Sequence, residues 1–189
     1  MIYLASGSAR RRELLRQIAV VFTPLSSEID EAVRPAEPPW DYVRRMAREK
    51  AAAGAQERDR HGLAFAPVLG ADTIVVQGGD IVRKPDCVAA ASAALHRLSG
   101  AEHAVYTALC LLGRDRYETV VRTEVSFKVL TDAEIDAYCA TGEPIGKAGG
   151  YAIPGRAALF ITHLSGSYSG VVGLPLYECG QLLQAEGVL

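Results

Sequence analysis

The chain has 189 residues, 49% of them hydrophobic, and a formal net charge of -2 at pH 7. This composition excludes an intrinsically disordered chain and a strongly basic nucleic-acid coat protein. No apolar run approaches the ~18 residues of a membrane-spanning helix. The short run at 2–5, followed by arginines, is unlike a signal peptide. We therefore expect a cytoplasmic protein without membrane or nucleic-acid partners, folded as one domain over residues 1–189.

Strand and helix patterns alternate through the first half of the chain. Ser8 is suited to cap a helix that carries Leu14 and Leu15 on one face. In chain order the sequence predicts a strand at 2–5, the helix after Ser8, a strand at 20–25, a helix at 40–58 and a strand at 68–76. A Gly78-Gly79 turn then leads into a short strand at 80–83. The next helix is capped by Asp86 and ends near Ser99.

The second half contains the clearest strand pattern. Residues 121–129 alternate apolar and polar side chains, as in a strand with one wet face, and 104–112 supply an antiparallel partner. The remaining predicted elements are a helix that begins with a capping box at Thr131 and ends at Gly142, a strand region at 151–164, and a helix from Pro175. Interleaved helices and hairpins predict a mixed sheet in an α/β to α+β fold.

The cysteines and histidines do not indicate a soft-metal site. The four cysteines lie far apart without a C-x-x-C pair, and the four histidines lack the spacing of metal ligands. We expect buried free thiols, and any metal would be a hard cation held by carboxylates.

Three consecutive arginines, Arg10, Arg11 and Arg12, fall in the opening turn of the first predicted helix. Each cation there is unfavourable by about 0.3–1 kcal/mol, because the helix macrodipole is positive at that end. An anion that binds over the helix end, between backbone N–H groups, the Ser8 hydroxyl and the guanidinium groups, explains the arrangement. A solvated basic turn that tolerates the cost is the alternative.

Asp72 lies inside the apolar strand 68–76. Because a buried carboxylate without a partner is costly, it should be paired, bound to a metal, or placed at a strand end that faces a cleft. Gly70 and Ala71 remove side-chain bulk, so another group can come close. The alternative is a carboxylate that caps a neighbouring backbone. The pair Asp30-Glu31 is by itself typical of a solvated loop.

The lysines complete this inventory. Lys84 precedes Pro85 and is therefore held in an extended conformation. Lys50 lies beside a run of alanines and by itself is typical of an exposed helix face, and Lys147 precedes a glycine pair. Together with the arginines and carboxylates they form the set of charges that a triphosphate–metal site requires.

Nine segments in order make the chain resemble the Maf family of nucleoside triphosphate pyrophosphatases. They are residues 4–15 (LASGSARRRELL), Asp30-Glu31, 49–51 (EKA), 70–73 (GADT), Lys84-Pro85, 98–100 (LSG) with His103, 147–151 (KAGGY), 166–168 (GSY) and 172–175 (VGLP). The resemblance implies a mixed twisted sheet with flanking helices, in two lobes around a deep cleft, as in the inosine triphosphate pyrophosphatases. It also implies a homodimer that hydrolyses a nucleoside triphosphate to the monophosphate and pyrophosphate with Mg²⁺ or Mn²⁺.

The resemblance further assigns roles to individual residues. Asp72 matches the catalytic carboxylate of the family, and Glu31 matches its acidic metal-binding position, so these two would hold the metal. The positions that match the phosphate contacts of the family are Ser8, Arg10, Arg11, Lys50 and Lys84. The chain departs from the family at Ala19, where glycine is usual.

Substrate choice is implied by three positions. The branch that acts on dTTP and UTP carries Arg, Thr and Gln there, and this chain has Arg10, Thr73 and Pro154. Two matches of three favour dTTP and UTP over 7-methyl-GTP, but proline has no side-chain group to read a base edge. A non-catalytic nucleotide sensor or division-associated regulatory protein is the main alternative to an enzyme, and a nucleic-acid binder that uses the arginines is the second.

Overall fold

The computed structural model describes residues 1–26 and 28–189. Its elements are β1 (Ile2–Ala5), α1 (Ala9–Gln17), β2 (Phe22–Leu25), α2 (Pro39–Arg60), β3 (Val68–Gln77), β4 (Asp80–Val82), α3 (Val88–Leu98), β5 (Glu102–Leu112), β6 (Arg116–Phe127), α4 (Asp132–Cys139), the 3-10 helices η1 (Ala148–Gly150) and η2 (Arg156–Phe160), β7 (Ile161–Ser165), α5 (Tyr168–Val172) and α6 (Leu176–Ala185). No helix among the described residues combines the length and apolar character that crossing a bilayer requires.

The described strands form one seven-stranded mixed sheet. Six strands follow the order β2-β1-β3-β5-β6-β7, and β4 pairs with β3 outside this path. β1 runs parallel to β2 and β3, whereas β4 is antiparallel to β3 and β7 is antiparallel to β6. This sheet and its helices confirm the predicted mixed α/β class.

Backbone contacts divide the chain into two compact units. The first contains residues 1–72, 107–121 and 173–189, and the second contains residues 73–106 and 122–172. The strands β3, β5 and β6 therefore each begin in one unit and end in the other. The single domain and the deep cleft between two lobes stay predictions.

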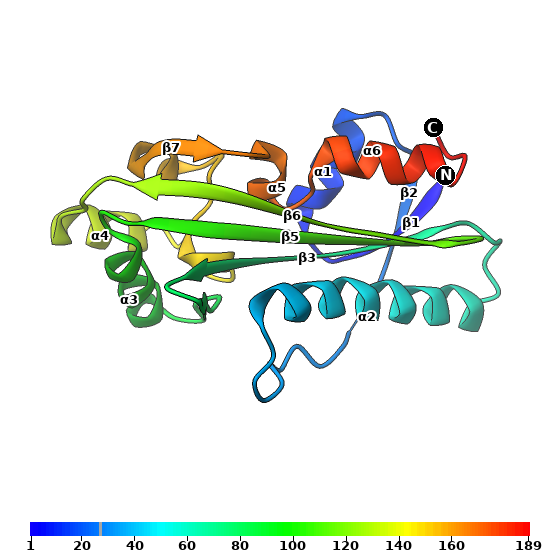
Figure 1. Ribbon diagram of the computed structural model, residues 1–189, viewed down its shortest axis with the longest axis horizontal. Coiled ribbons are helices and arrows are strands. Elements are labelled where there is room, and N and C mark those ends of the chain that lie inside the picture. Colours follow the sequence, from blue (N-terminus) through cyan, green and yellow to red (C-terminus); the bar gives the residue numbers. More distant parts are fainter. Residues whose placement is uncertain (27) are drawn as a thin grey trace. The chain divides into compact units, whose positions relative to one another are not determined.

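In the first unit, α2 packs very closely against β1 and β3. A Cβ atom on Gly70 would lie 2.3 Å from the Ala47 carbonyl oxygen and 2.5 Å from the Ala51 backbone nitrogen. On the helix side, a Cβ atom on Gly54 would lie 2.7 Å from the Ala5 Cβ atom. In Figure 1, α2 lies on one side of the strands of this unit, and α1 and α6 lie on the other. Small residues on both surfaces thus set the short distance between helix and sheet.

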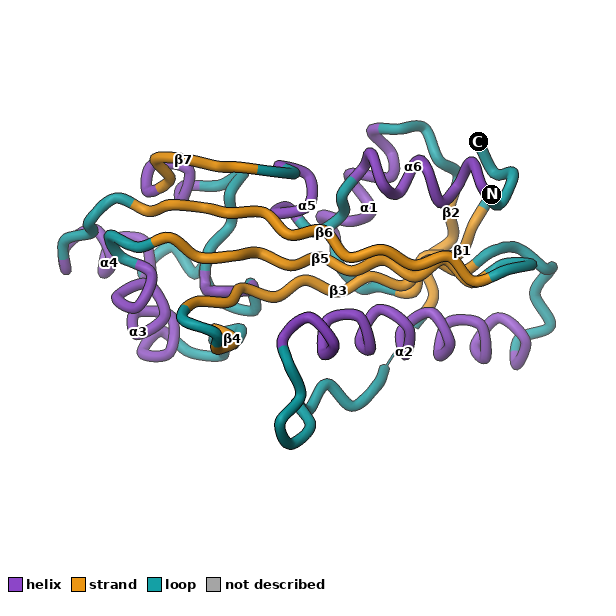
Figure 2. Tube along the Cα trace, in the orientation of Figure 1, coloured by secondary structure: helices purple, strands orange, loops and turns teal. Residues whose placement is uncertain are grey.

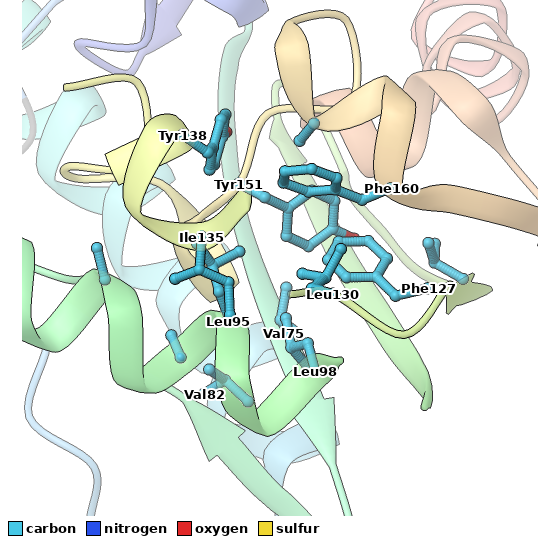
Figure 3. Close-up of a cluster of buried hydrophobic side chains, with 14 of the residues drawn as sticks. Val75, Val82, Leu95, Leu98, Phe127, Leu130, Ile135, Tyr138, Tyr151 and Phe160 are labelled. Carbon is cyan, nitrogen blue, oxygen red and sulfur yellow. The ribbon is translucent and has the colours of Figure 1, made fainter. Parts of the chain in front are cut away.

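The second unit has a core rich in aromatic rings (Figure 3). Phe127 meets Tyr151 and Phe160 edge to face, with ring centroids 4.9 Å and 6.1 Å apart. His103 joins this cluster, and its Nε2 atom lies 2.8 Å from the Tyr151 hydroxyl oxygen. Aliphatic side chains from α3 and α4, among them Leu95, pack beneath the rings. Tyr151 and Ile153 both belong to this core, which holds the backbone around them in place.

Two predicted helix caps are confirmed, and one is wrong. The Ser8 side chain accepts a hydrogen bond from the Arg11 backbone N–H, and Thr131 and Glu134 form the expected capping box. Helix α3 instead begins after Cys87, without a side-chain cap from that residue, so Asp86 lies one position too early. Helix α4 ends at Cys139, before Gly142.

The predicted strand region at 151–164 is correct only at its end, where β7 begins at Ile161. Pro154 lacks a backbone N–H for a strand ladder. The chain turns there instead, and the Gly155 N–H donates to the Ala152 carbonyl at 2.9 Å. Val129 was expected on the apolar face of a strand, but β6 ends at Phe127 and Val129 is 77% exposed.

Candidate active site

Lys50 joins two carboxylates from distant parts of the chain. Its Nζ atom lies 2.8 Å from Asp72 Oδ1 on β3 and 2.5 Å from Glu31 Oε1 in the loop before α2. Lys50 is buried because it follows Met46 by four residues and Ala47 by three, which places it on the core-facing side of the helix. The alternative of an ordinary exposed helix face is therefore wrong for Lys50.

Asp72 is 2% exposed, and its ion pair explains how an apolar strand accommodates a carboxylate. The sequence prediction that Asp72 has a close partner is confirmed. The predicted role of Gly70 is confirmed as well, because α2 is the group that comes close there. Glu31 is less buried than Asp72, because 43% of its side chain is exposed.

Arg11 ties the start of α1 to the end of the chain. Its Nε donates to the Gly173 carbonyl at 2.8 Å, and its Nη1 donates to Ser6 Oγ at 3.1 Å. Burial lowers the pKa of Arg11 below its usual value, while the nearby carboxylates of Asp72 and Glu31 act in the opposite direction. Arg11 is thus held in a fixed position, where its charge interacts with the carboxylates of Asp72 and Glu31.

The other residues at the start of α1 are placed differently. The Ser8 hydroxyl caps the helix by accepting from the Arg11 N–H at 3.4 Å. Arg10 has a side chain that is 42% exposed and pairs with Glu13 at 3.4 Å. A positive helix end, capped by Ser8 and flanked by arginines, remains suited to an anion.

Three predicted site residues belong to the second unit. Thr73 is buried on β3, Lys84 is exposed in the segment between β4 and α3, and Pro154 is exposed in its turn. The structure joins Glu31, Lys50 and Asp72 by ion pairs within the first unit. The meeting of Thr73, Lys84 and Pro154 with those residues stays a prediction.

The turn that carries Pro154 is held from both ends. The Tyr138 hydroxyl accepts from the Ala152 N–H at 3.1 Å and donates to Glu143 Oε1 at 2.8 Å. The other Glu143 oxygen accepts from the Arg156 N–H at 3.3 Å. Tyr138 and Glu143 thereby fix the backbone on either side of Pro154.

Sequence reasoning missed two residues of the first unit. Ser6 was named only as part of the segment 4–15, but its side chain accepts a hydrogen bond from Arg11. Tyr42 donates from its hydroxyl to the Glu31 carbonyl at 2.9 Å. The available signal was the spacing of Tyr42 and Met46 on one face of the helix, which marks a buried tyrosine but not its partner.

The carboxylates fit a metal that takes most of its ligands from elsewhere. Among the described residues, no group of three or more His, Cys, Asp or Glu side chains could hold a metal ion by itself. Asp72 and Glu31 nevertheless reach the same ammonium group, so one small cation can be shared between them. Mg²⁺ is commonly held by one or two carboxylates, with phosphate oxygens and water completing its shell.

The chain is similar over nearly its whole length to known proteins. The sequence model of the family described as Maf-like protein matches residues 1–186. A dTTP/UTP pyrophosphatase of Xanthomonas campestris is 50% identical over 192 residues, covering 99% of both chains. A dTTP/UTP pyrophosphatase of Nitrosomonas europaea is 48% identical over 197 residues, covering 99% of this chain and 95% of the relative. The chain belongs to the Maf family.

A solved structure, a nucleoside-triphosphatase described as a dITP/XTP pyrophosphatase from Mycobacterium abscessus, is also similar. It is 16% identical and covers 75% of this chain and 93% of its own, with a TM-score of 0.42. A TM-score this low does not by itself establish a shared fold.

Proposed function

We propose that this protein hydrolyses nucleoside triphosphates, foremost dTTP and UTP, to the nucleoside monophosphate and pyrophosphate with the help of Mg²⁺ or Mn²⁺. The observation that carries the proposal is the junction of Lys50 with Asp72 and Glu31 in a chain of the Maf family. Relatives with nearly half of their residues in common are named dTTP/UTP pyrophosphatases. The physiological role that fits this reaction is removal of unwanted nucleotides from the pool.

The charges of the site support a polyphosphate and a cation together. Arg11 and Lys50 carry two positive charges, and Asp72 and Glu31 carry two negative ones, so this set is balanced. A triphosphate adds several negative charges, which a divalent cation offsets. Arg10 and Lys84 are the further cations that the resemblance assigns to the phosphates.

In the proposed mechanism, Asp72 is the catalytic base. Its carboxylate orients a water molecule and accepts a proton as the water oxygen bonds to the α-phosphorus. The bond from that phosphorus to the bridging oxygen breaks, and pyrophosphate leaves. Lys50, Lys84, Arg10 and Arg11 stabilise the charge that develops on the leaving group, and Ser8 contributes a hydrogen bond.

Asp72 and Glu31 are the residues that would hold the metal. The bound cation supplies charge neutralisation and polarisation of phosphate and water oxygens. Lys50 keeps the two carboxylates close together before the cation and substrate arrive, because one oxygen of each faces its ammonium group.

A turnover screen tests the proposal. Purified protein is mixed with each common ribo- and deoxynucleoside triphosphate and with 7-methyl-GTP, in Mg²⁺, in Mn²⁺ and in a chelator. We expect pyrophosphate and monophosphate from dTTP and UTP, and little product in the chelator. Tight nucleotide binding without product identifies the non-catalytic sensor instead, and preference for 7-methyl-GTP overturns the substrate assignment.

Pro154 makes base selectivity a separate question. The screen therefore includes Pro154→Gln, which restores the side-chain amide of the dTTP/UTP branch in a turn held by Tyr138 and Glu143. If position 154 reads the base, kcat/KM for dTTP and UTP rises relative to the other nucleotides. An unchanged ratio assigns base recognition to other residues.

The remaining expectations also stand as proposals. We infer a cytoplasmic homodimer that binds nucleotides rather than nucleic acid or membrane. The four cysteines are free, as is usual in a reducing compartment, although Cys87 is exposed and not buried as expected. Arg44, Arg48 and Arg116 converge on Glu118 instead of forming an open basic stripe. Light scattering at several concentrations tests the dimer, and salt-dependent DNA or RNA binding would contradict the nucleotide-only assignment.

A further inference from the structure

Glu31 meets Lys50 from a segment that has no regular secondary structure. Between β2 and α2 the described residues form only loop and turn (Figure 2). Ordering such a backbone costs about 1–2 kcal/mol per residue, so contacts with neighbouring elements must hold it in place. Those contacts come from α2, the helix that also carries Lys50.

Arg45 makes the strongest of these contacts. Its Nε and Nη2 atoms lie 2.6 Å from the two carboxylate oxygens of Glu37, which is a bidentate ion pair. The same Nη2 atom donates to the Ala32 carbonyl oxygen at 3.0 Å. The pair is largely removed from water, with 12% of the Arg45 side chain and 9% of the Glu37 side chain exposed. Nη1 pairs with Glu49 at 3.3 Å, which anchors the guanidinium to its own helix.

Tyr42 adds a second contact one helical turn earlier. Its hydroxyl donates to the Glu31 carbonyl oxygen at 2.9 Å. Asp30 completes the arrangement by accepting the Ala32 N–H at 2.9 Å.

We propose that Arg45, together with Glu37, is a positioning residue that holds the Glu31 carboxylate against Lys50 and Asp72, where the divalent cation binds. This inference rests on the proposed function. Arg45 binds the carbonyl of Ala32, directly after Glu31, and the carboxylate of Glu37, two residues before α2 begins. The loop between these two points therefore has little freedom. The bidentate geometry requires the planar guanidinium group, which lysine cannot reproduce.

The test compares Arg45→Met with a matched control on the same helix. Arg48→Met removes a similar bidentate pair, because Arg48 contacts both oxygens of Glu118 at 2.7 Å and 2.6 Å, but Glu118 lies on β6 and not in the Glu31 loop. Two quantities are measured without substrate: Mn²⁺ affinity by electron paramagnetic resonance, and amide hydrogen exchange of residues 30–36. Turnover is measured separately.

We expect Arg45→Met to weaken Mn²⁺ binding by about 10-fold, as is common when a group that orients a metal ligand is removed. Exchange of residues 30–36 should become faster, and kcat should fall more than KM for the nucleotide rises. Glu37→Gln and Arg45→Lys should change Mn²⁺ affinity, loop exchange and kcat in the same direction but by smaller factors. These two variants replace Arg45→Met in the test if that variant fails to fold. Arg48→Met should leave Mn²⁺ affinity and loop exchange at the wild-type level.

Unchanged Mn²⁺ affinity and loop exchange in Arg45→Met overturn the inference, as does an equal effect of Arg48→Met. A wild-type protein that does not bind Mn²⁺ also overturns it. If the wild-type protein binds Mn²⁺ but releases no pyrophosphate, the proposed function fails, while the exchange and affinity comparisons still decide the role of Arg45.

Discussion

Lys50 and Asp72 lie 22 residues apart in the sequence, yet their side chains meet at 2.8 Å in the interior of the first unit. The pair forms because α2 packs onto β3 at a glycine, which brings Lys50 level with the carboxylate two residues further along the strand. A buried ion pair of this kind adds little to the free energy of folding, because both charged groups lose their hydration. Its geometry instead gives the carboxylate of an apolar strand a hydrogen-bonding partner.

Replacement of Asp72 by Asn tests the catalytic carboxylate. Asn keeps the volume and can accept from Lys50, but it cannot take a proton from water. We expect turnover to fall by about 10²–10⁴-fold, the range for loss of a general base, with little change in the unfolding temperature. Asp80→Asn, at an exposed carboxylate on β4, is the control and should retain full turnover. Near-normal activity in Asp72→Asn would remove Asp72 from the mechanism.

Replacement of Lys50 by Met tests the link between charge and stability. Asp72 loses its buried partner, and breaking such a pair costs on the order of 3 kcal/mol, whereas the half-exposed Glu31 is screened by water. We expect Lys50→Met to lower the unfolding temperature. Added Mg²⁺ should recover part of this loss, and so should Asp72→Asn combined with Lys50→Met. Lys128→Met, which breaks a more exposed pair with Glu134, should change stability much less. A Mg²⁺ response equal in wild type and variant would contradict this account.

Gly70→Ala tests the close packing of α2 on β3. The new methyl group would lie 2.3 Å from the Ala47 carbonyl oxygen, which is backbone and cannot move alone. We expect a loss of about 1–3 kcal/mol of folding free energy, as is usual for overpacking, and reduced turnover because Lys50 moves with the helix. Gly180→Ala in α6, where no atom lies within 4 Å of the new methyl group, should instead stabilise by about 0.5–1 kcal/mol. Chemical denaturation measures both.

The end of α1 carries a stability defect. Ala19 has φ 55°, in the left-handed region that favours glycine. Its N–H donates to the Arg16 carbonyl and the Val20 N–H donates to the Leu15 carbonyl, which is a Schellman motif. We expect Ala19→Gly, which restores the usual family residue, to stabilise by about 0.5–1 kcal/mol. Ala52→Gly, inside α2, should instead destabilise the protein. The unfolding temperatures of the two variants test this expectation.

His103 predicts a pH dependence of stability. Burial lowers the pKa of His103 to about 4, and its partner is the Tyr151 hydroxyl. Between the ordinary pKa near 6.5 and this value, the unfolded chain binds a proton that the folded one does not, so stability falls as pH falls. The loss at about pH 5 relative to neutral pH is on the order of 2 kcal/mol. His103→Gln should flatten this slope in denaturation curves at the two pH values, and an unchanged slope would assign the effect to other groups.

Much of the local structure could be predicted from the sequence, because its causes are local. The Ser8 cap, the capping box at Thr131 and the Gly78-Gly79 turn depend on residues within a few positions of one another, and the structure confirms all three. The errors have local causes as well. Pro154 turns the chain where apolar composition alone predicted a strand, and Val129 lies beyond the point where β6 ends.

The sequence by itself determined that Asp72 must be paired, bound to a metal or placed at a strand end that faces a cleft, because a carboxylate in an apolar strand is costly wherever the strand lies. It could not determine that Lys50 is that partner, since the alanines around Lys50 are equally compatible with an exposed face. Only the packing of α2 on Gly70 decided which side of the helix is buried. The contacts of Tyr42 and Arg45 with the Glu31 loop were decided in the same way. A side chain's own neighbours set its conformation, but its partner across the fold depends on how close two backbones can approach.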